Sequence, residues 1–152
     1  MKNNKRKGII LAGGTGSRLY PITQGISKQL VPVFNKPMIY YPLATLMLAN
    51  IKEILIITNH YDLNSFKRLL NDGSHLGIKI DYSIQAAPNG LAEAFIIGEE
   101  FLDDNPAALI LGDNLFHGDN LLQSMMKNVS DDGATIFAHS VNNPSNYGVA
   151  EF

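Results

Sequence analysis

The chain contains no cysteine among its 152 residues. A disulfide framework and thiolate metal sites are therefore excluded, and a reducing compartment fits without being established. An excess of charge of one sign is lacking too, because 12 Lys and Arg residues face 14 Asp and Glu residues, a formal net charge of -2. No basic stripe interleaved with aromatic residues is present, which disfavours binding to a nucleic-acid polymer.

Long hydrophobic runs are also missing. The start MKNNKRKGIILA imitates a secretory signal, but Gly13 and Gly14 follow the apolar run after about five residues, whereas a signal needs roughly 7–15. No later run approaches the length of a membrane span. We therefore expect a basic tail at residues 1–7, one compact domain at 8–152, no membrane partner and a cytoplasmic location.

The motifs of several common sites are absent. No G-x-x-x-x-G-K-[ST] phosphate loop occurs, and Leu19 stands where the dinucleotide fingerprint that begins at Gly14 needs its third glycine. A G-x-S-x-G nucleophile elbow is missing, so acyl transfer has no support. None of the four histidines has the i, i+4 partner of a zinc-binding helix.

What is present is an alternation of strand-length and helix-length segments. The apolar runs lie at residues 8–11, 53–58, 78–84, 107–111 and 134–140. The predicted helices lie at 38–50, with Pro37 in the first turn, at 63–70, with Asp62 as cap and a stop at 71–73, at 91–102 and at 120–128. Continuously hydrophobic strands separated by helices predict an α/β fold of three layers, a mainly parallel, Rossmann-like sheet with helices on both faces.

Parallel sheets bind ligands beyond the carboxyl ends of their strands. After the first strand comes GGTGSR, residues 13–18. Its glycines let backbone N–H groups approach an anion, Thr15 and Ser17 add hydroxyl donors, and Arg18 adds a permanent planar cation. This composition predicts a phosphate site, and it equally suits a tight turn with a surface arginine.

Polar residues follow the other strands as well. Lys28 is either a solvated charge or a second cation for the same phosphates. Gln85 offers one donor and one acceptor to a base edge, or simply ends its strand. Gly90 closes a Pro-Asn-Gly turn that would also let a flat ring lie against the backbone. Asp113, in LGDN, is either a Mg²⁺ ligand or the cap of a turn.

Five motifs in order resemble the sugar-nucleotide pyrophosphorylases. They read KGIILAGGTGSRLYPIT, SKQLVPVFNKPMIYYPLATLMLA, QAAPNGLAEAF, LGDNLFHG and YGVAEF, and they extend from Lys7 to Phe152. The likeness is stronger to the branch that joins dTTP to glucose 1-phosphate. Relatives often carry Thr15 and Ser17 in the opposite order, but both residues supply hydroxyls.

The resemblance implies that a glucose 1-phosphate oxygen attacks the α-phosphorus of dTTP in the presence of Mg²⁺, giving dTDP-glucose and pyrophosphate. It implies three catalytic residues, Arg18, Lys28 and Asp113, the last of which holds the metal. It implies sugar contacts from Asn114 and Gly148. The implied nucleotide contacts are Leu11, Gly13, Gly14, Thr15, Gly16, Ser17, Arg18, Gln29, Gln85 and Gly90.

The resemblance also implies groups that this sequence does not contain: a Glu-Lys pair for the sugar phosphate, a second metal-binding aspartate and further strands. We therefore expect an incomplete nucleotidyltransferase domain that binds nucleotide with little or no turnover, and a homo-oligomer in the complete enzyme. UTP or CTP with another hexose 1-phosphate, and a non-catalytic nucleotide-binding module, stay open as alternatives. An NAD(P)-binding domain is disfavoured, because no ribose-binding acid follows the second strand.

Overall fold

The computed structural model describes residues 6–14, 16–121, 123, 126, 133–146 and 148–149. The chain divides into two compact units, Met1–His117 and Gly118–Phe152, which are described separately. The first unit holds every strand and α-helix named below.

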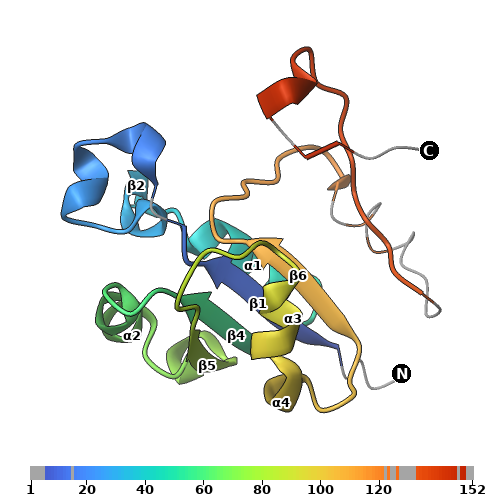
Figure 1. The fold of residues 1–152 in the computed structure, drawn as a ribbon. Helices are drawn as coiled ribbons and strands as arrows, with labels where there is room; N and C mark the ends of the chain where they lie inside the picture. The colour runs from blue at the N-terminus through green and yellow to red at the C-terminus, as the bar shows by residue number, and fades with distance from the viewer. Residues whose placement is uncertain are drawn as a thin grey trace. The chain divides into compact units, whose positions relative to one another are not determined.

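The first unit is built on a parallel sheet in the order β5-β4-β1-β6 (Figure 1). Its strands are β1 (Lys7–Ala12), β4 (Glu53–Thr58), β5 (Lys79–Ile84) and β6 (Ala107–Leu111). The pairing is in register along the sheet, so Ile10 lies opposite both Ile56 and Ile110. The prediction of a mainly parallel α/β sheet is confirmed.

Helices cover both faces of this sheet (Figure 1). On one face lies α1 (Tyr40–Leu48), so close that a Cβ on Gly8 would stand 2.8 Å from the Leu46 side chain. The α2 helix (Leu63–Leu70) is joined to β5, where the Tyr82 hydroxyl donates to the Asn71 carbonyl at 2.6 Å. On the other face, α3 (Glu93–Ile97) and α4 (Glu99–Leu102) pack on a cluster formed by Ile9, Leu55, Ile57 and Ala94. The three predicted layers are therefore present.

Two helix predictions were wrong in detail. The predicted 91–102 helix is two helices separated at Gly98, whose backbone departs from helical geometry with φ −88° and ψ 2°. Pro37 is not in a first helical turn but in the two-residue strand β3 (Lys36–Pro37), which pairs with β2 (Pro32–Val33). The α1 helix begins only at Tyr40, since the backbone N–H of Met38 donates to the Val31 carbonyl.

Three short 3₁₀ helices connect β1 to this hairpin. They are η1 (Ser17–Leu19), η2 (Ile22–Gln24) and η3 (Lys28–Leu30). A fourth, η4 (Ser74–Leu76), precedes β5. No helix in the described residues is both long and apolar enough to cross a bilayer.

In the second unit, the predicted strand at 134–140 is wrong. These residues have no strand assignment and are exposed throughout. An apolar run without a neighbouring strand to bond has nothing to stabilise an extended ladder. The unit contains η5 (Pro144–Asn146), and the predicted 120–128 helix falls largely outside the described residues. In the first unit, residues 1–5 of the predicted tail also lie outside them, whereas Lys7, predicted as the last residue of the tail, is the first residue of β1.

Candidate active site at the carboxyl edge of the sheet

The carboxyl ends of the four parallel strands form one edge, and backbone bonds join the segments that leave them. The Gln85 N–H donates to the Thr58 carbonyl at 2.8 Å, and the Gly112 N–H donates to the Leu11 carbonyl at 2.9 Å. The Thr58 hydroxyl donates to the Ala12 carbonyl at 3.3 Å. The residues that follow β1, β5 and β6 therefore emerge on the same side of the sheet.

Gly13 brings the glycine turn into contact with Gln85, although β4 separates their strands. A Cβ built on Gly13 would stand 2.8 Å from the Gln85 Oε1 atom. A side chain at this position would therefore displace the amide. Gln85 itself is only 5% exposed.

A carboxylate that the sequence did not single out holds Gln85 from the other side. The Gln85 Nε2 atom donates to Glu93 Oε2 at 2.6 Å, and Asn89 Nδ2 donates to Glu93 Oε1 at 2.9 Å. Donation from Asn89, and then from Gln85, lowers the pKa of Glu93 below its usual value. Glu93 is therefore an ionised acceptor at neutral pH that links the Gln85 side chain to the turn before α3.

The turn that follows β1 folds onto the Lys28 segment. Gly16 has a positive φ of 63°, and a Cβ there would meet Thr23 at 2.8 Å and Lys28 Cβ at 2.9 Å. The Thr23 hydroxyl donates to the Gly16 carbonyl at 3.0 Å. Glycine is required here both by the backbone conformation and by the close approach of Lys28.

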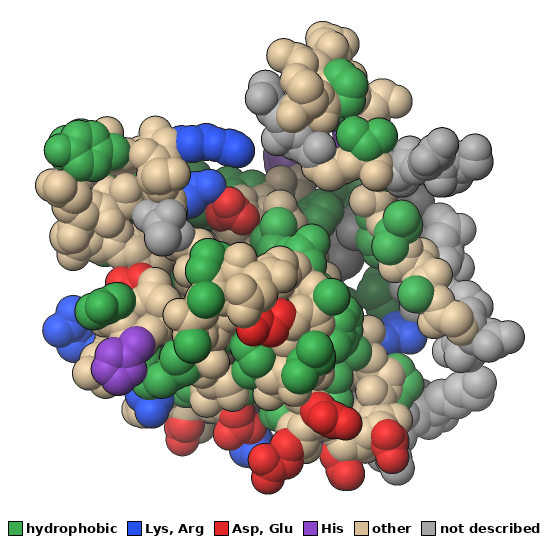
Figure 2. All heavy atoms as spheres, viewed as in Figure 1, with side chains coloured by type: hydrophobic (Ala, Val, Ile, Leu, Met, Phe, Trp, Pro, Cys, Tyr) green, Lys and Arg blue, Asp and Glu red, His purple; other side chains and the backbone are tan. Residues whose placement is uncertain are grey.

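Lys28 and Asp113 form an ion pair across this edge. The Lys28 Nζ atom lies 2.6 Å from Asp113 Oδ2, and the two side chains are 29% and 30% exposed. Both side chains are thus partly buried and partly accessible to solvent. Figure 2 shows basic side chains beside an acidic one between the 17–30 segment and the sheet.

The described side chains suit Mg²⁺ only if phosphate oxygens supply further ligands. No group of three or more His, Cys, Asp or Glu side chains that could hold a metal occurs in the described residues. Mg²⁺ commonly uses one or two carboxylates and takes its other ligands from phosphates and water. Asp113 already holds one cation, the Lys28 ammonium group, so its carboxylate is placed to accept positive charge at this edge.

The other predicted site residues fall into two groups. Gly14, Ser17 and Arg18 are exposed on the segment after β1, and Arg18 has no ion-pair or hydrogen-bond partner in the part of the chain that the structure describes. Asn114 is half-buried after β6, and Gly90 is exposed with a φ of 105°. Their contacts with ligands stay predictions.

The remaining predicted site residues are Leu11, Gln29, Gly148 and Thr15. Leu11 packs against the core cluster, and Gln29 is buried, with its Oε1 atom accepting from the Ser27 hydroxyl at 2.7 Å. A Cβ on Gly112 would lie 2.9 Å from Gln29 Cγ, so Gln29 packs beneath the segment that carries Asp113. Gly148 is exposed in the second unit, and Thr15 lies outside the described residues.

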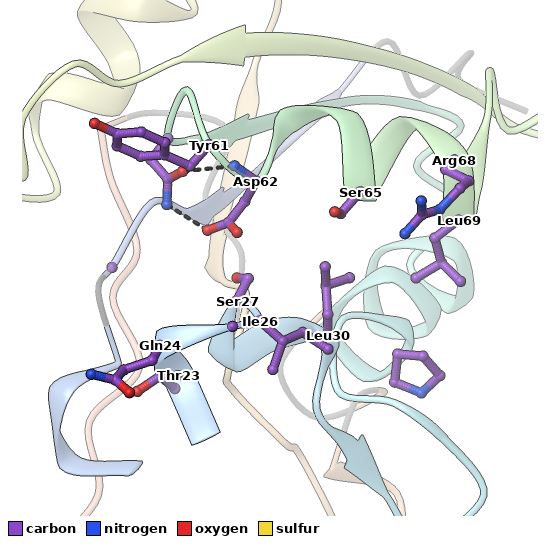
Figure 3. Close-up of a pocket in the computed structure, with 14 residues that line it drawn as sticks. Thr23, Gln24, Ile26, Ser27, Leu30, Tyr61, Asp62, Ser65, Arg68 and Leu69 are labelled. Carbon is purple, nitrogen blue, oxygen red and sulfur yellow. Dashed lines mark hydrogen bonds between the residues drawn. The ribbon is translucent and has the colours of Figure 1, made fainter. Parts of the chain in front are cut away.

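A pocket of about 700 Å³ adjoins the glycine turn, with Gly14 in its wall. Figure 3 shows Ser65 and Arg68 of α2 on one side and Ile26 and Leu30 on the other. Asp62 stands at the N-cap position of α2, as predicted, but its side chain makes no capping hydrogen bond and accepts a bond from the Asn59 side chain at 2.6 Å in this pocket. The pocket provides space next to the predicted phosphate turn.

Glu93 and Asn89 are the functional candidates that sequence reasoning missed. Asn89 lies in the turn before α3 and Glu93 is the first residue of that helix, so helical spacing gave no signal for the pair.

The chain is similar in sequence to known glucose-1-phosphate thymidylyltransferases. The chain is 58% identical over 147 residues to the glucose-1-phosphate thymidylyltransferase of Neisseria meningitidis, a match that covers 96% of this chain and 51% of the relative. The chain thus spans about half the length of the curated relatives it matches. The predicted resemblance to sugar-nucleotide pyrophosphorylases is confirmed.

Solved structures agree. A Bacillus anthracis protein described as a candidate glucose-1-phosphate thymidylyltransferase, in complex with sucrose, matches with a TM-score of 0.73 and 40% identity over 79% of this chain and 49% of its own. A UDP-glucose pyrophosphorylase bound to UDP-glucose matches with a TM-score of 0.63 and 27% identity, covering 80% of this chain and 52% of its own. The family model described as nucleotidyl transferase matches residues 7–152, and the chain therefore belongs to the nucleotidyl transferase family.

Proposed function

We propose that these residues form the nucleotide-binding part of a Mg²⁺-dependent enzyme that joins dTTP and glucose 1-phosphate into dTDP-glucose. The relative from Neisseria meningitidis carries the corresponding name. The observation that carries the proposal is the Lys28–Asp113 pair, which lies at the same edge as the Gly13 turn and Gln85.

The reaction is an in-line displacement. A phosphate oxygen of glucose 1-phosphate forms a new bond to the α-phosphorus of dTTP, while the bond from that phosphorus to the oxygen bridging to the β-phosphate breaks. Pyrophosphate leaves with the electron pair of the broken bond. Such a transfer depends mainly on positioning and on positive charge around the phosphates.

Different residues of the chain position the substrates and supply positive charge. The backbone N–H groups of the Gly13–Gly16 turn and the Arg18 guanidinium hold the triphosphate, and Gln85 contacts the base. Lys28 neutralises phosphate charge, and Asn114 lies beside Asp113 toward the sugar. Mg²⁺ held by Asp113, when bound, supplies further positive charge to phosphate oxygens.

The test is a titration of the ¹⁵N-labelled chain with dTTP and MgCl₂, followed by NMR. We expect shifts at Gly13, Gly14 and Gln85 in the unmodified chain, and affinity at least 10-fold weaker in Lys28→Met and Asp113→Asn, since each loses a charge-assisted contact. The matched controls, Lys79→Met and Asp81→Asn, break an exposed 3.0 Å pair on β5. Shifts confined to other regions, or equal losses in the controls, would contradict the proposal.

Turnover by the 152 residues alone is proposed to be low. The chain spans about half of its relatives, and the resemblance places the sugar-phosphate groups outside this sequence. Release of pyrophosphate from dTTP, glucose 1-phosphate and Mg²⁺ measures it directly. Pyrophosphate release at the rates usual for enzymes would contradict the proposed low turnover. It would not contradict the proposed nucleotide site.

A uridine nucleotide is the second candidate substrate. The structure that matches at 27% identity is a UDP-glucose pyrophosphorylase, and thymine and uracil share the base edge that an amide can read. Competition between dTTP and UTP in the same titration separates the two, with tighter binding of dTTP expected.

A further inference from the structure

The Gln85 amide has two chemically different ends, and its neighbours decide which end faces the nucleotide. An amide nitrogen only donates hydrogen bonds, and an amide oxygen only accepts them. The end presented to a base therefore determines which base edges can pair with it.

Glu93 fixes this choice. A glutamate carboxylate is ionised at neutral pH and only accepts hydrogen bonds, so the amide end 2.6 Å from Glu93 Oε2 must be the nitrogen. The amide oxygen then points the other way, to within 2.8 Å of the place where a Cβ on Gly13 would be. The assignment follows from the chemistry of the carboxylate.

The surroundings prevent a simple exchange of the two ends. Gln85 is 5% exposed, and a flip would place its oxygen against the Glu93 carboxylate. Asn89 holds the second carboxylate oxygen at 2.9 Å, so Glu93 cannot turn away without losing that bond. Gly90, at the predicted base site, directly follows Asn89.

We propose that Glu93 is a positioning residue that presents the Gln85 oxygen to the base and so gives the site a preference for thymine or uracil over cytosine. This inference rests on the proposed function, because it takes Gln85 as the base contact. Thymine and uracil carry an N–H at ring position 3, which can donate to the Gln85 oxygen. Cytosine has a lone pair there, which repels the oxygen and leaves both groups unpaired.

The experiment measures the affinities of dTTP, UTP and CTP with Mg²⁺ by calorimetry. In the unmodified chain we expect dTTP and UTP to bind about 10- to 100-fold more tightly than CTP, the range that one unpaired buried polar group produces. In Glu93→Gln the partner can donate or accept, so the Gln85 amide is free to flip. The preference over CTP should fall to within about threefold, by weaker dTTP binding, tighter CTP binding or both.

Two controls separate positioning from general damage. Glu100→Gln makes the same charge change at an exposed residue of α4 and should leave the preference unchanged. Gln85→Leu removes the amide, so the preference should disappear, and adding Glu93→Gln to it should change nothing further. Thermal unfolding of each variant verifies that it is folded.

A readout without nucleotide tests the first step by itself. The side-chain NH₂ signals of Gln85 in a ¹⁵N spectrum should shift in Glu93→Gln and not in Glu100→Gln. Equal binding of all three nucleotides, or an unchanged preference in Glu93→Gln, would overturn the inference and leave the proposed function intact. Failure of every nucleotide to bind the unmodified chain would overturn both.

Discussion

Gly13 is the residue at which the predicted phosphate turn and the predicted base contact meet. A methyl group there would stand 2.8 Å from the Gln85 oxygen, which is closer than real Cβ contacts allow. The backbone of Gly13 needs no positive φ. An effect of substitution at this position therefore reports on the displaced amide and not on backbone strain.

We expect Gly13→Ala to weaken dTTP binding by about 10-fold or more, the cost of misplacing one buried hydrogen-bonding group. Calorimetry with Mg²⁺ and dTTP measures it. Gly25→Ala is the matched control, because nothing lies within 4 Å of a Cβ at Gly25 and its φ is −109°. Unchanged affinity in Gly13→Ala would mean that Gln85 does not contact the nucleotide.

At the scale of single residues, the sequence indicated candidate site residues that follow the predicted strands. Gln85 and Asp113 come directly after or shortly after apolar runs, and the parallel sheet brings their segments to one edge. Lys28 was left open from spacing alone, and the 2.6 Å pair with Asp113 brings it to this edge. Glu93 was missed, because side-chain pairing across a strand end and a helix start leaves no periodic pattern.

At the scale of elements, Gly98 lets α3 and α4 lie close to the sheet. A Cβ on this residue would be 3.0 Å from the Ile9 side chain and 3.0 Å from the Ala94 carbonyl. Both neighbours are fully buried. They have little room to move away, since protein interiors are closely packed.

We expect Gly98→Val to lower the free energy of unfolding by about 1–3 kcal/mol, the usual cost of overpacking a core. Urea unfolding at neutral pH measures it. Ile96→Val, on the exposed face of the same helix at 73% exposure, should change it by less than about 0.5 kcal/mol. A Gly98→Val chain as stable as the unmodified one would contradict the packing described here.

Tyr82 joins β5 to the end of α2 and gives this contact a pH dependence. Burial, with a smaller contribution from the negative charge of Asp72, raises the pKa of Tyr82 from 10.0 to about 12. Below pH 10 the hydroxyl is protonated in both the folded and unfolded chain. Between these values the unfolded chain ionises first, so stability falls as the pH rises.

We therefore expect the free energy of unfolding to decrease from pH 10 to 12 and part of this decrease to be absent in Tyr82→Phe. Urea unfolding at several pH values measures both chains. The raised pKa of Lys79, caused by Asp81, also costs stability at alkaline pH, but it contributes equally to both and cancels in the comparison. Parallel pH profiles would show that Tyr82 ionises normally.

The strands were predicted best where hydrophobicity was continuous. The predicted 53–58 and 107–111 runs coincide with β4 and β6, and β4 is buried along almost its whole length, as a strand covered on both faces is expected to be. The 134–140 run has a similar composition but remains exposed. Composition does not reveal whether a neighbouring strand is available.

At the scale of the whole molecule, charge is distributed unevenly over the first unit. Acidic residues gather around α4, at Glu99, Glu100, Asp103 and Asp104, the opposite end of the first unit from the candidate site (Figure 2). The predicted phosphate edge carries Arg18 and Lys28 together with the carboxylates of Asp113 and Glu93. Positive and negative groups are therefore balanced at this edge, whereas the α4 end carries acidic groups.

The buried core belongs to the first unit. The buried hydrophobic residues of the described chain run from Ile9 to Ile110, whereas residues 133–145 are all exposed. Hydrophobic burial is the main favourable contribution to folding. The described hydrophobic core therefore lies entirely before residue 118.

We expect a chain ending at His117 to unfold cooperatively, with a free energy of unfolding within about 1 kcal/mol of the longer chain, since it keeps every buried hydrophobic residue of the described chain. The shift of Gln85 on addition of dTTP and Mg²⁺ should persist, because Gly13, Lys28, Glu93 and Asp113 all remain. Gly98→Val should cost the same in both lengths, because the neighbours of Gly98, Ile9, Leu55 and Ala94, are present in both. A shortened chain that unfolds without a cooperative transition would show that residues 118–152 complete the core, and the candidate site would then require both units.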